Sequence, residues 1–84
     1  MMKTKFYYTY IIQTESSPPH FYAGFTENLK QRLIHHNNGG DPHTSKFRPW
    51  RIKTAMAFTD RNQALRFERY LKTASGRAFA IKRL

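Results

Sequence analysis

The sequence has no cysteine and only five acidic side chains among its 84 residues. Without cysteine, a disulfide framework, a thiolate zinc site and a cysteine nucleophile are all excluded. The longest apolar run is far shorter than the roughly 18 residues that a membrane-spanning helix needs. Residues 1–5 lead into alternating aromatic side chains and not into a leucine-rich signal sequence. We therefore expect a soluble intracellular protein with no membrane partner.

Positive charge and aromatic side chains are plentiful instead. Lys and Arg number 15, which gives a net charge of +10 at pH 7, and aromatic residues make up 15% of the chain. Residues 43–84 carry eleven of the 15 basic residues against two acids, Asp60 and Glu68. The aromatic content favours a folded core, and the charge predicts a polyanionic partner. A surface that is simply rich in lysine and arginine is the plain alternative.

The chain has room for one domain, so we expect residues 1–84 to form one. Residues 5–13 (KFYYTYIIQ) are dense in aromatic and β-branched residues and predict a strand. Residues 14–19 contain two serines and two prolines, which indicates a turn or a short loop. Residues 20–25 (HFYAGF) form a second aromatic run, so the simplest pairing is an antiparallel hairpin.

Capping signals bound a helix after this hairpin. Thr26 can cap its first turn, which would contain Glu27. Leu29 and Leu33 lie four residues apart and therefore on one face. The run NNGG at residues 37–40 ends the helix, because glycine and asparagine tolerate the left-handed conformation that closes helices.

The second half of the chain predicts a loop, a strand and two helices. Residues 41–49 (DPHTSKFRP) follow neither the helical nor the strand period, and residues 50–58 alternate like a strand with one buried face. Asp60 caps the next helix, with Gln63 at the capping-box distance. The apolar stripe of that helix is Ala64, Phe67, Leu71 and Ala74.

Ser75 and Gly76 are expected to end this helix, and residues 77–84 to form a short terminal one. The element order is then strand, strand, helix, strand, helix, helix. This order predicts an α+β fold, in which helices flank a small three-stranded sheet that is antiparallel or mixed.

Three features of these elements could carry chemistry. Arg32 and His36 lie one helical turn apart beside the leucine stripe, so we expect them at the boundary between core and solvent. A surface arginine and a capping histidine are the structural alternative. Four tyrosines lie on the expected hairpin, where a tyrosine is ordinarily a packing residue, and the pattern does not rank them: Tyr7, Tyr8, Tyr10 and Tyr22. A phenol near a guanidinium can, however, have its ionised form stabilised and act as a proton acceptor.

Glu68 is the third feature, because it borders the apolar stripe of its helix instead of facing solvent. It is either an ion-pair partner of the basic residues around it or a ligand for a hard cation. The other acids are better explained by caps and turns, so a metal-dependent nuclease would use one metal ion. A zinc site built from the four histidines is disfavoured, since the sequence has neither cysteine nor a helical His-Glu-x-x-His pair.

Five motifs follow one another along the chain: Tyr8-Thr9-Tyr10, Tyr22-Ala23-Gly24, Arg32-Leu33, His36-Asn37 and Glu68. In this order they resemble the GIY-YIG nuclease domain, above all its small stand-alone bacterial YhbQ-like (UPF0213-like) group. The resemblance covers essentially the whole chain. The first motif departs from the family's Gly-Ile-Tyr, and no asparagine follows the glutamate where many nuclease members carry one.

The resemblance implies a DNA endonuclease of the bacterial cytoplasm that hydrolyses phosphodiesters in repair or recombination, with one Mg²⁺ or Mn²⁺ ion per site. It makes Tyr10 the general base, with Tyr22 beside it. In the family, the residue that matches Arg32 neutralises the charge that develops on the phosphate. The resemblance likewise implies that His36 orients the water or relays a proton, and that Glu68 holds the metal ion. Phosphate contacts outside the centre are then Lys46, Arg48, Arg51 and Lys72.

Other functions stay open at this point. The chain could be a catalytically weak or inactive nucleic-acid-binding module of the same fold. It could also be a small ribosome-associated protein whose basic face binds RNA. RNA as the substrate, and a protein partner that supplies specificity, are open in the same way, because a chain this short has little surface for reading bases.

Overall fold

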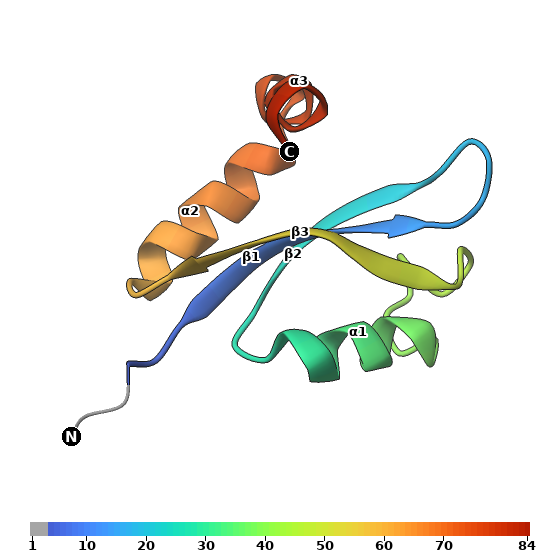
Figure 1. The fold of residues 1–84 in the computed structure, drawn as a ribbon, viewed down its shortest axis with the longest axis horizontal. Helices are drawn as coiled ribbons and strands as arrows, with labels where there is room; N and C mark the ends of the chain where they lie inside the picture. The colour runs from blue at the N-terminus through green and yellow to red at the C-terminus, as the bar shows by residue number, and fades with distance from the viewer. Residues whose placement is uncertain (1–3) are drawn as a thin grey trace.

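The computed structural model describes residues 4–84, so the prediction for residues 1–3 lies outside it. The α+β prediction is confirmed, with the element order β-β-α-β-α-α (Figure 1). None of the helices in the described part of the chain is long and apolar enough to cross a membrane. The elements are β1 (Tyr7–Thr14), β2 (Phe21–Thr26), α1 (Leu29–Asn37), β3 (Trp50–Phe58), α2 (Arg61–Leu71) and α3 (Ala74–Arg83).

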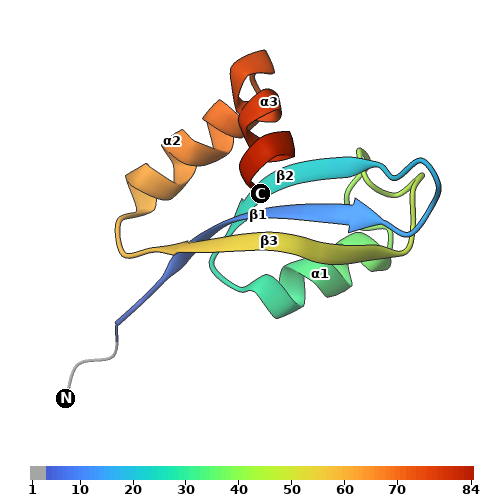
Figure 2. The same ribbon diagram turned by 45° about the horizontal axis from the view of Figure 1, so that its top comes forward.

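The three strands form one antiparallel sheet in the order β2-β1-β3. Because β1 is the central strand, most of its residues are buried from both sides. Helix α1 covers one face of the sheet, and α2 and α3 stand on the other (Figures 1 and 2). Strands β2 and β3 are the two edges of the sheet.

The bounds of β3 match the sequence prediction, but the prediction that the strand has a single buried face is wrong. The pairing of β1 with β3 shifts register between Ile11 and Ile12. On one side of this shift, Ile52 packs into the cluster around Ile12 on the α1 face. On the other side, the ring of Phe58 lies 5.9 Å from that of Phe67 on α2. The alternating apolar series of β3 therefore crosses from one face of the sheet to the other.

The N-terminal cap of helix α1 lies two residues later than predicted. Thr26 is the last residue of β2, and the true cap is Asn28, whose side-chain oxygen accepts from the backbone N–H of Gln31 at 3.0 Å. Glu27 consequently lies outside the helix, where it pairs with Lys5 at 2.6 Å. The end of the helix is as predicted, because the backbone turns at Gly39, whose φ is 76°.

Helices α2 and α3 divide earlier than predicted. Asp60 does cap α2, since its carboxylate accepts from the N–H groups of Asn62 and Gln63. The break, however, lies before Thr73, which caps α3 through the N–H of Gly76 at 3.0 Å. Gly76 is therefore inside α3, where it allows the close approach of the two helices. A Cβ there would lie 2.7 Å from the Cα of Leu71.

Candidate functional site

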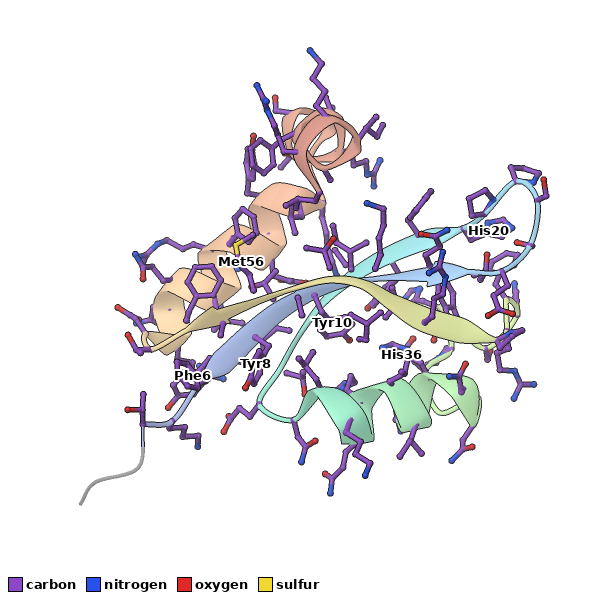
Figure 3. All side chains as sticks on the ribbon, in the orientation of Figure 1. Phe6, Tyr8, Tyr10, His20, His36 and Met56 are labelled. Atoms are coloured by element: carbon purple, nitrogen blue, oxygen red, sulfur yellow. The ribbon has the colours of Figure 1, made fainter. Side chains whose placement is uncertain are left out.

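A buried chain of hydrogen bonds links three distant parts of the sequence. Tyr10 leaves the central strand on the α1 side, and its hydroxyl oxygen lies 2.8 Å from Nε2 of His36 (Figure 3). Nδ1 of the same imidazole lies 2.7 Å from Oγ1 of Thr44. Tyr10 is 2% exposed, and His36 and Thr44 are fully buried. The expectation that His36 sits at the boundary of the core is wrong, because the loop after α1 covers it.

This loop, residues 41–49, is held by a clamp between α1 and β3. The side-chain amide of Asn37 donates to the carbonyl of Trp50 at 3.0 Å and accepts from its N–H at 2.6 Å. The indole Nε1 of Trp50 donates to the carbonyl of Thr44 at 2.9 Å. The clamp fixes Thr44 beneath the imidazole, which gives an irregular segment a defined place in the core.

Burial sets the protonation of the two rings. It lowers the pKa of His36, a shift that the charge of Asp41 opposes and that of Arg32 favours. It also raises the pKa of Tyr10 well above its usual range, against the opposing charge of Arg32. At neutral pH the pair is therefore a phenol and a neutral imidazole. If Nδ1 carries the ring proton and donates to Thr44, Nε2 is free to accept from Tyr10.

Edge strand β2 contributes an aromatic ring and a glycine. The ring of Tyr22 lies 5.5 Å from that of His36, edge to face, so Tyr10 and Tyr22 both contact the imidazole. Gly24 pairs with Tyr10 across the sheet. A Cβ at Gly24 would lie 2.5 Å from Cζ of the phenol, so only glycine leaves room for the ring.

Arg32 and Glu68 bring opposite charges to these rings. Both act on the ionisation of Tyr10, Arg32 favouring the phenolate and Glu68 opposing it. The carboxylate of Glu68 pairs with Lys72 at 2.8 Å, which is the first of the two alternatives for this residue. The ammonium of Lys72 also lies 5.0 Å from the centre of the Tyr22 ring. Helix α2 thus reaches around the edge of the sheet to Tyr22.

The donors around Glu68 suit a hard cation. Glu68 offers carboxylate oxygens, which Mg²⁺ prefers over nitrogen or sulfur, and its partner Lys72 also lies beside the ring of Tyr22. No cluster of three or more His, Asp or Glu side chains occurs within residues 4–84. A cation here would have Glu68 as its one carboxylate ligand, and Lys72, whose side chain is 46% exposed, would have to move aside.

The four expected phosphate contacts do not form one cluster. Lys46 and Arg48 are exposed on the loop of residues 41–49, and Arg48 donates from Nη1 to the carbonyl of Asn37 at 3.3 Å. Arg51 is exposed at the start of β3. Lys72 stands apart from these three, because it follows α2 and pairs with Glu68.

Sequence reasoning missed Thr44 and the structural use of Asn37. Thr44 lies in a segment with no periodicity, and its bond to His36 depends on how that segment folds back. In the sequence, Asn37 is visible only as part of the run that ends the helix and of the His36-Asn37 motif. One signal in the sequence could have indicated this role: an amide side chain at the end of a helix that a short loop joins to a buried strand.

Comparison with known proteins gives a consistent family. A GIY-YIG catalytic domain profile matches residues 6–82. A UPF0213 protein of Lacticaseibacillus paracasei is 38% identical over 72 residues, which is 84% of this chain and 79% of that protein. A second UPF0213 protein, from Bacillus licheniformis, is 32% identical over 75 residues, or 88% and 75% of the two chains.

A further relative is larger. It is the structure-specific endonuclease subunit SLX1 of Scheffersomyces stipitis, which is 39% identical over 70 residues. The match covers 75% of this chain but only 21% of that protein, so the likeness concerns one part of it. No solved structure matches the chain.

Proposed function

The chain belongs to the GIY-YIG family, and from that premise we propose that it is a DNA endonuclease that hydrolyses phosphodiester bonds with one divalent metal ion. The observation that carries the proposal is the pair formed by a buried phenol and a neutral imidazole, with Tyr22 against the imidazole. An arginine and a carboxylate act on the same phenol. A domain that only bound nucleic acid would have no need for this arrangement.

Tyr10 and His36 work together as the base in this proposal. Because burial opposes ionisation of Tyr10, the phenol needs a place to send its own proton. Nε2 of neutral His36 is 2.8 Å away and can take it. As the hydroxyl oxygen of Tyr10 accepts a proton from water, its proton passes to His36. The oxygen of the water then bonds to phosphorus, the bond from phosphorus to the leaving oxygen breaks, and the leaving oxygen takes a proton from the surrounding water.

Arg32 and Glu68 serve to stabilise negative charge on the phosphate in this proposal. Arg32 is the only basic side chain of α1 that acts on both Tyr10 and His36, so its charge is close to the forming phosphorane. A cation such as Mg²⁺ or Mn²⁺, held by Glu68, would supply further stabilisation of charge on the phosphate oxygens. Lys46, Arg48 and Arg51 remain proposed backbone contacts, which hold the DNA without reading its sequence.

One observation favours a second candidate function, a domain that binds nucleic acid without cutting it. Lys72 occupies the carboxylate of Glu68, and no asparagine follows that glutamate in the sequence. A domain in which this pair persists would bind nucleic acid without cutting it. A protein partner that supplies specificity, and a place in bacterial DNA repair, belong to the proposal in the same way, since the first relatives are bacterial.

The test is a cleavage assay with matched variants. The protein is incubated with supercoiled, branched and linear DNA in Mg²⁺ or in EDTA, and strand breaks are counted on a denaturing gel. Glu68→Ala and Arg32→Ala should each abolish metal-dependent cutting. Glu27→Ala and Lys30→Ala, which remove exposed charges of the same sign elsewhere, should leave it intact.

Two results would decide against the proposal. Cutting that survives both site substitutions would come from a contaminant or from another site. Binding of every DNA without any cutting, with folding verified by circular dichroism, would favour the second candidate.

A further inference from the structure

A second surface lies on the other face of the sheet from α1. Helices α2 and α3 stand over one half of that face, and the half toward the hairpin loop carries no helix (Figure 2). Between this half and α3 runs an open groove of about 920 Å³. Residues of the hairpin, of β3 and of α3 line it. The groove is thus distinct from the buried chain of Tyr10, His36 and Thr44.

The charge of the groove has one sign. Lys53, Lys72 and Arg77 line it, together with two histidines, and none of its lining residues is acidic. All three cations belong to exposed residues. The charged groups of Lys53 and Arg77 can meet a ligand directly, whereas the ammonium of Lys72 is paired with Glu68. A polyanion complements this lining, and a lipid tail or a protein segment without acidic residues would leave the charges of Lys53 and Arg77 without partners.

The floor of the groove carries an exposed aromatic ring. Phe21, the first residue of β2, is 56% exposed although the rest of its strand is more buried. Its neighbours in the groove are apolar side chains of β1, β2 and α3, among them Ile11, Ala23 and Ala80. An exposed ring among apolar side chains and flanking cations is the arrangement on which bases of a single strand stack.

The groove is continuous with the reaction site. Tyr22 lines the groove and also contacts the ring of His36. Lys72 lines it and also pairs with Glu68. A strand that is held at the site can therefore continue into the groove around the edge of β2.

We propose that this groove binds an unpaired segment of DNA next to the bond that is cut, with one base stacked on Phe21 and phosphates on Lys53 and Arg77. The inference rests on the proposed function for its choice of DNA. A duplex does not fit this description, because its base faces are already stacked on each other and cannot reach the Phe21 ring.

The experiment measures binding, so it does not depend on cutting. In EDTA, fluorescence anisotropy follows a labelled oligothymidylate of about 15 nucleotides, close to the length that one small single-strand-binding fold covers. A matched duplex and a matched oligouridylate are the other probes. Phe21→Ala should weaken binding of the single DNA strand on the order of tenfold to a hundredfold. Phe21→Trp should keep the affinity, since it keeps an aromatic face.

Matched controls separate the groove from the general surface. Phe6 is 41% exposed and lies at the opposite end of the sheet from His20 (Figure 3). Phe6→Ala should change binding by about twofold or less. Lys53→Ala should lower the slope of log affinity against log salt by about 0.7, the value for one phosphate of a single strand. Arg66→Ala, outside the groove, should leave the slope as it is.

Three results would overturn the inference. Phe21→Ala and Phe6→Ala could prove equal in effect, Phe21→Ala could weaken the duplex as much as the single strand, or the oligouridylate could bind as tightly and with the same dependence on Phe21. Loss of cutting in Mg²⁺ with the predicted binding intact would instead contradict the proposed function alone.

Discussion

Gly24→Ala is the sharpest single test of how the site is built. Gly24 is buried in β2 directly opposite Tyr10, and an added Cβ would lie 2.5 Å from Cζ of the phenol. Ordinary contacts of a Cβ begin at about 3.4 Å, so the ring would have to withdraw by about 0.9 Å, the difference between the two distances. The ring is 2% exposed and is packed against Ile12 and Trp50, so it has no free space to enter.

The displacement predicts losses of stability and of activity. Overpacking of this kind costs about 1–3 kcal/mol, which lowers Tm by roughly 4–8 °C per kcal/mol in a domain of this size. A shift of nearly 1 Å also moves the hydroxyl oxygen of Tyr10 from its position 2.8 Å from His36. A misplacement of about 1 Å can cost on the order of a hundredfold in rate. Thermal melting and the DNA cleavage assay measure the two effects.

Two comparisons identify the clash as the cause. At Gly40 an added Cβ would meet only the ring of His35, 2.5 Å from its Nδ1, and this exposed side chain can rotate away. Gly40→Ala should therefore melt within about 0.5 kcal/mol of the native protein. In a Tyr10→Leu background, which lacks the phenol, Gly24→Ala should cost little. A Gly24→Ala protein with native Tm and native cleavage would refute the packing of Tyr10 on Gly24.

Three further predictions follow from the same structure. Thr44→Val leaves Nδ1 of buried His36 without a partner and should cost about 1–3 kcal/mol, while Thr44→Ser should restore both stability and cleavage. Because the pKa of His36 is lower in the fold than its unfolded value near 6.5, the unfolded chain binds a proton first as the pH falls. Stability should therefore drop below about pH 6.5 until the folded pKa is reached, by up to about 1.4 kcal/mol per pH unit, and His36→Gln should remove this part of the dependence in melts between pH 5 and pH 8. Gly76→Ala would place a Cβ 2.7 Å from the Cα of Leu71, where backbone cannot rotate away, and urea unfolding should show a loss of at least 1–3 kcal/mol. An unchanged midpoint would mean that α2 and α3 do not pack as described.

Local patterns predicted most of the fold. The aromatic runs gave the hairpin, the alternation of residues 50–58 gave the bounds of β3, and Asp60 gave the start of α2. The errors arose where the tertiary structure decides the role of a residue. Gly76 was interpreted as a helix breaker, although it serves a close helix crossing that only the tertiary structure shows. The two faces of β3 were missed because the extra residue at the register shift, Lys53 of β3, does not interrupt the alternation of its sequence.

The residues of the site were harder to predict for a physical reason. Helical spacing placed Arg32 and His36 on one face, but burial of His36 depends on the irregular loop of residues 41–49. The sequence of such a loop shows no hydrophobic periodicity, because hydrogen bonds and not an apolar face fix its position. The Asn37 clamp and the bond from Trp50 to Thr44 are pairings that only the folded chain brings together.

Those bonds explain how so small a domain can bury polar side chains. An unpaired buried polar group costs about 1–3 kcal/mol, and domains of this kind have only about 5–15 kcal/mol of stability in total. Within residues 4–84, however, no buried side-chain nitrogen or oxygen lacks a partner. Each link from Tyr10 to His36 to Thr44 therefore contributes a sizeable share of the stability of the fold. The order of the loop and the alignment of the phenol with the imidazole are consequently coupled, so a substitution that loosens the loop should also disturb the hydrogen bond from Tyr10 to His36.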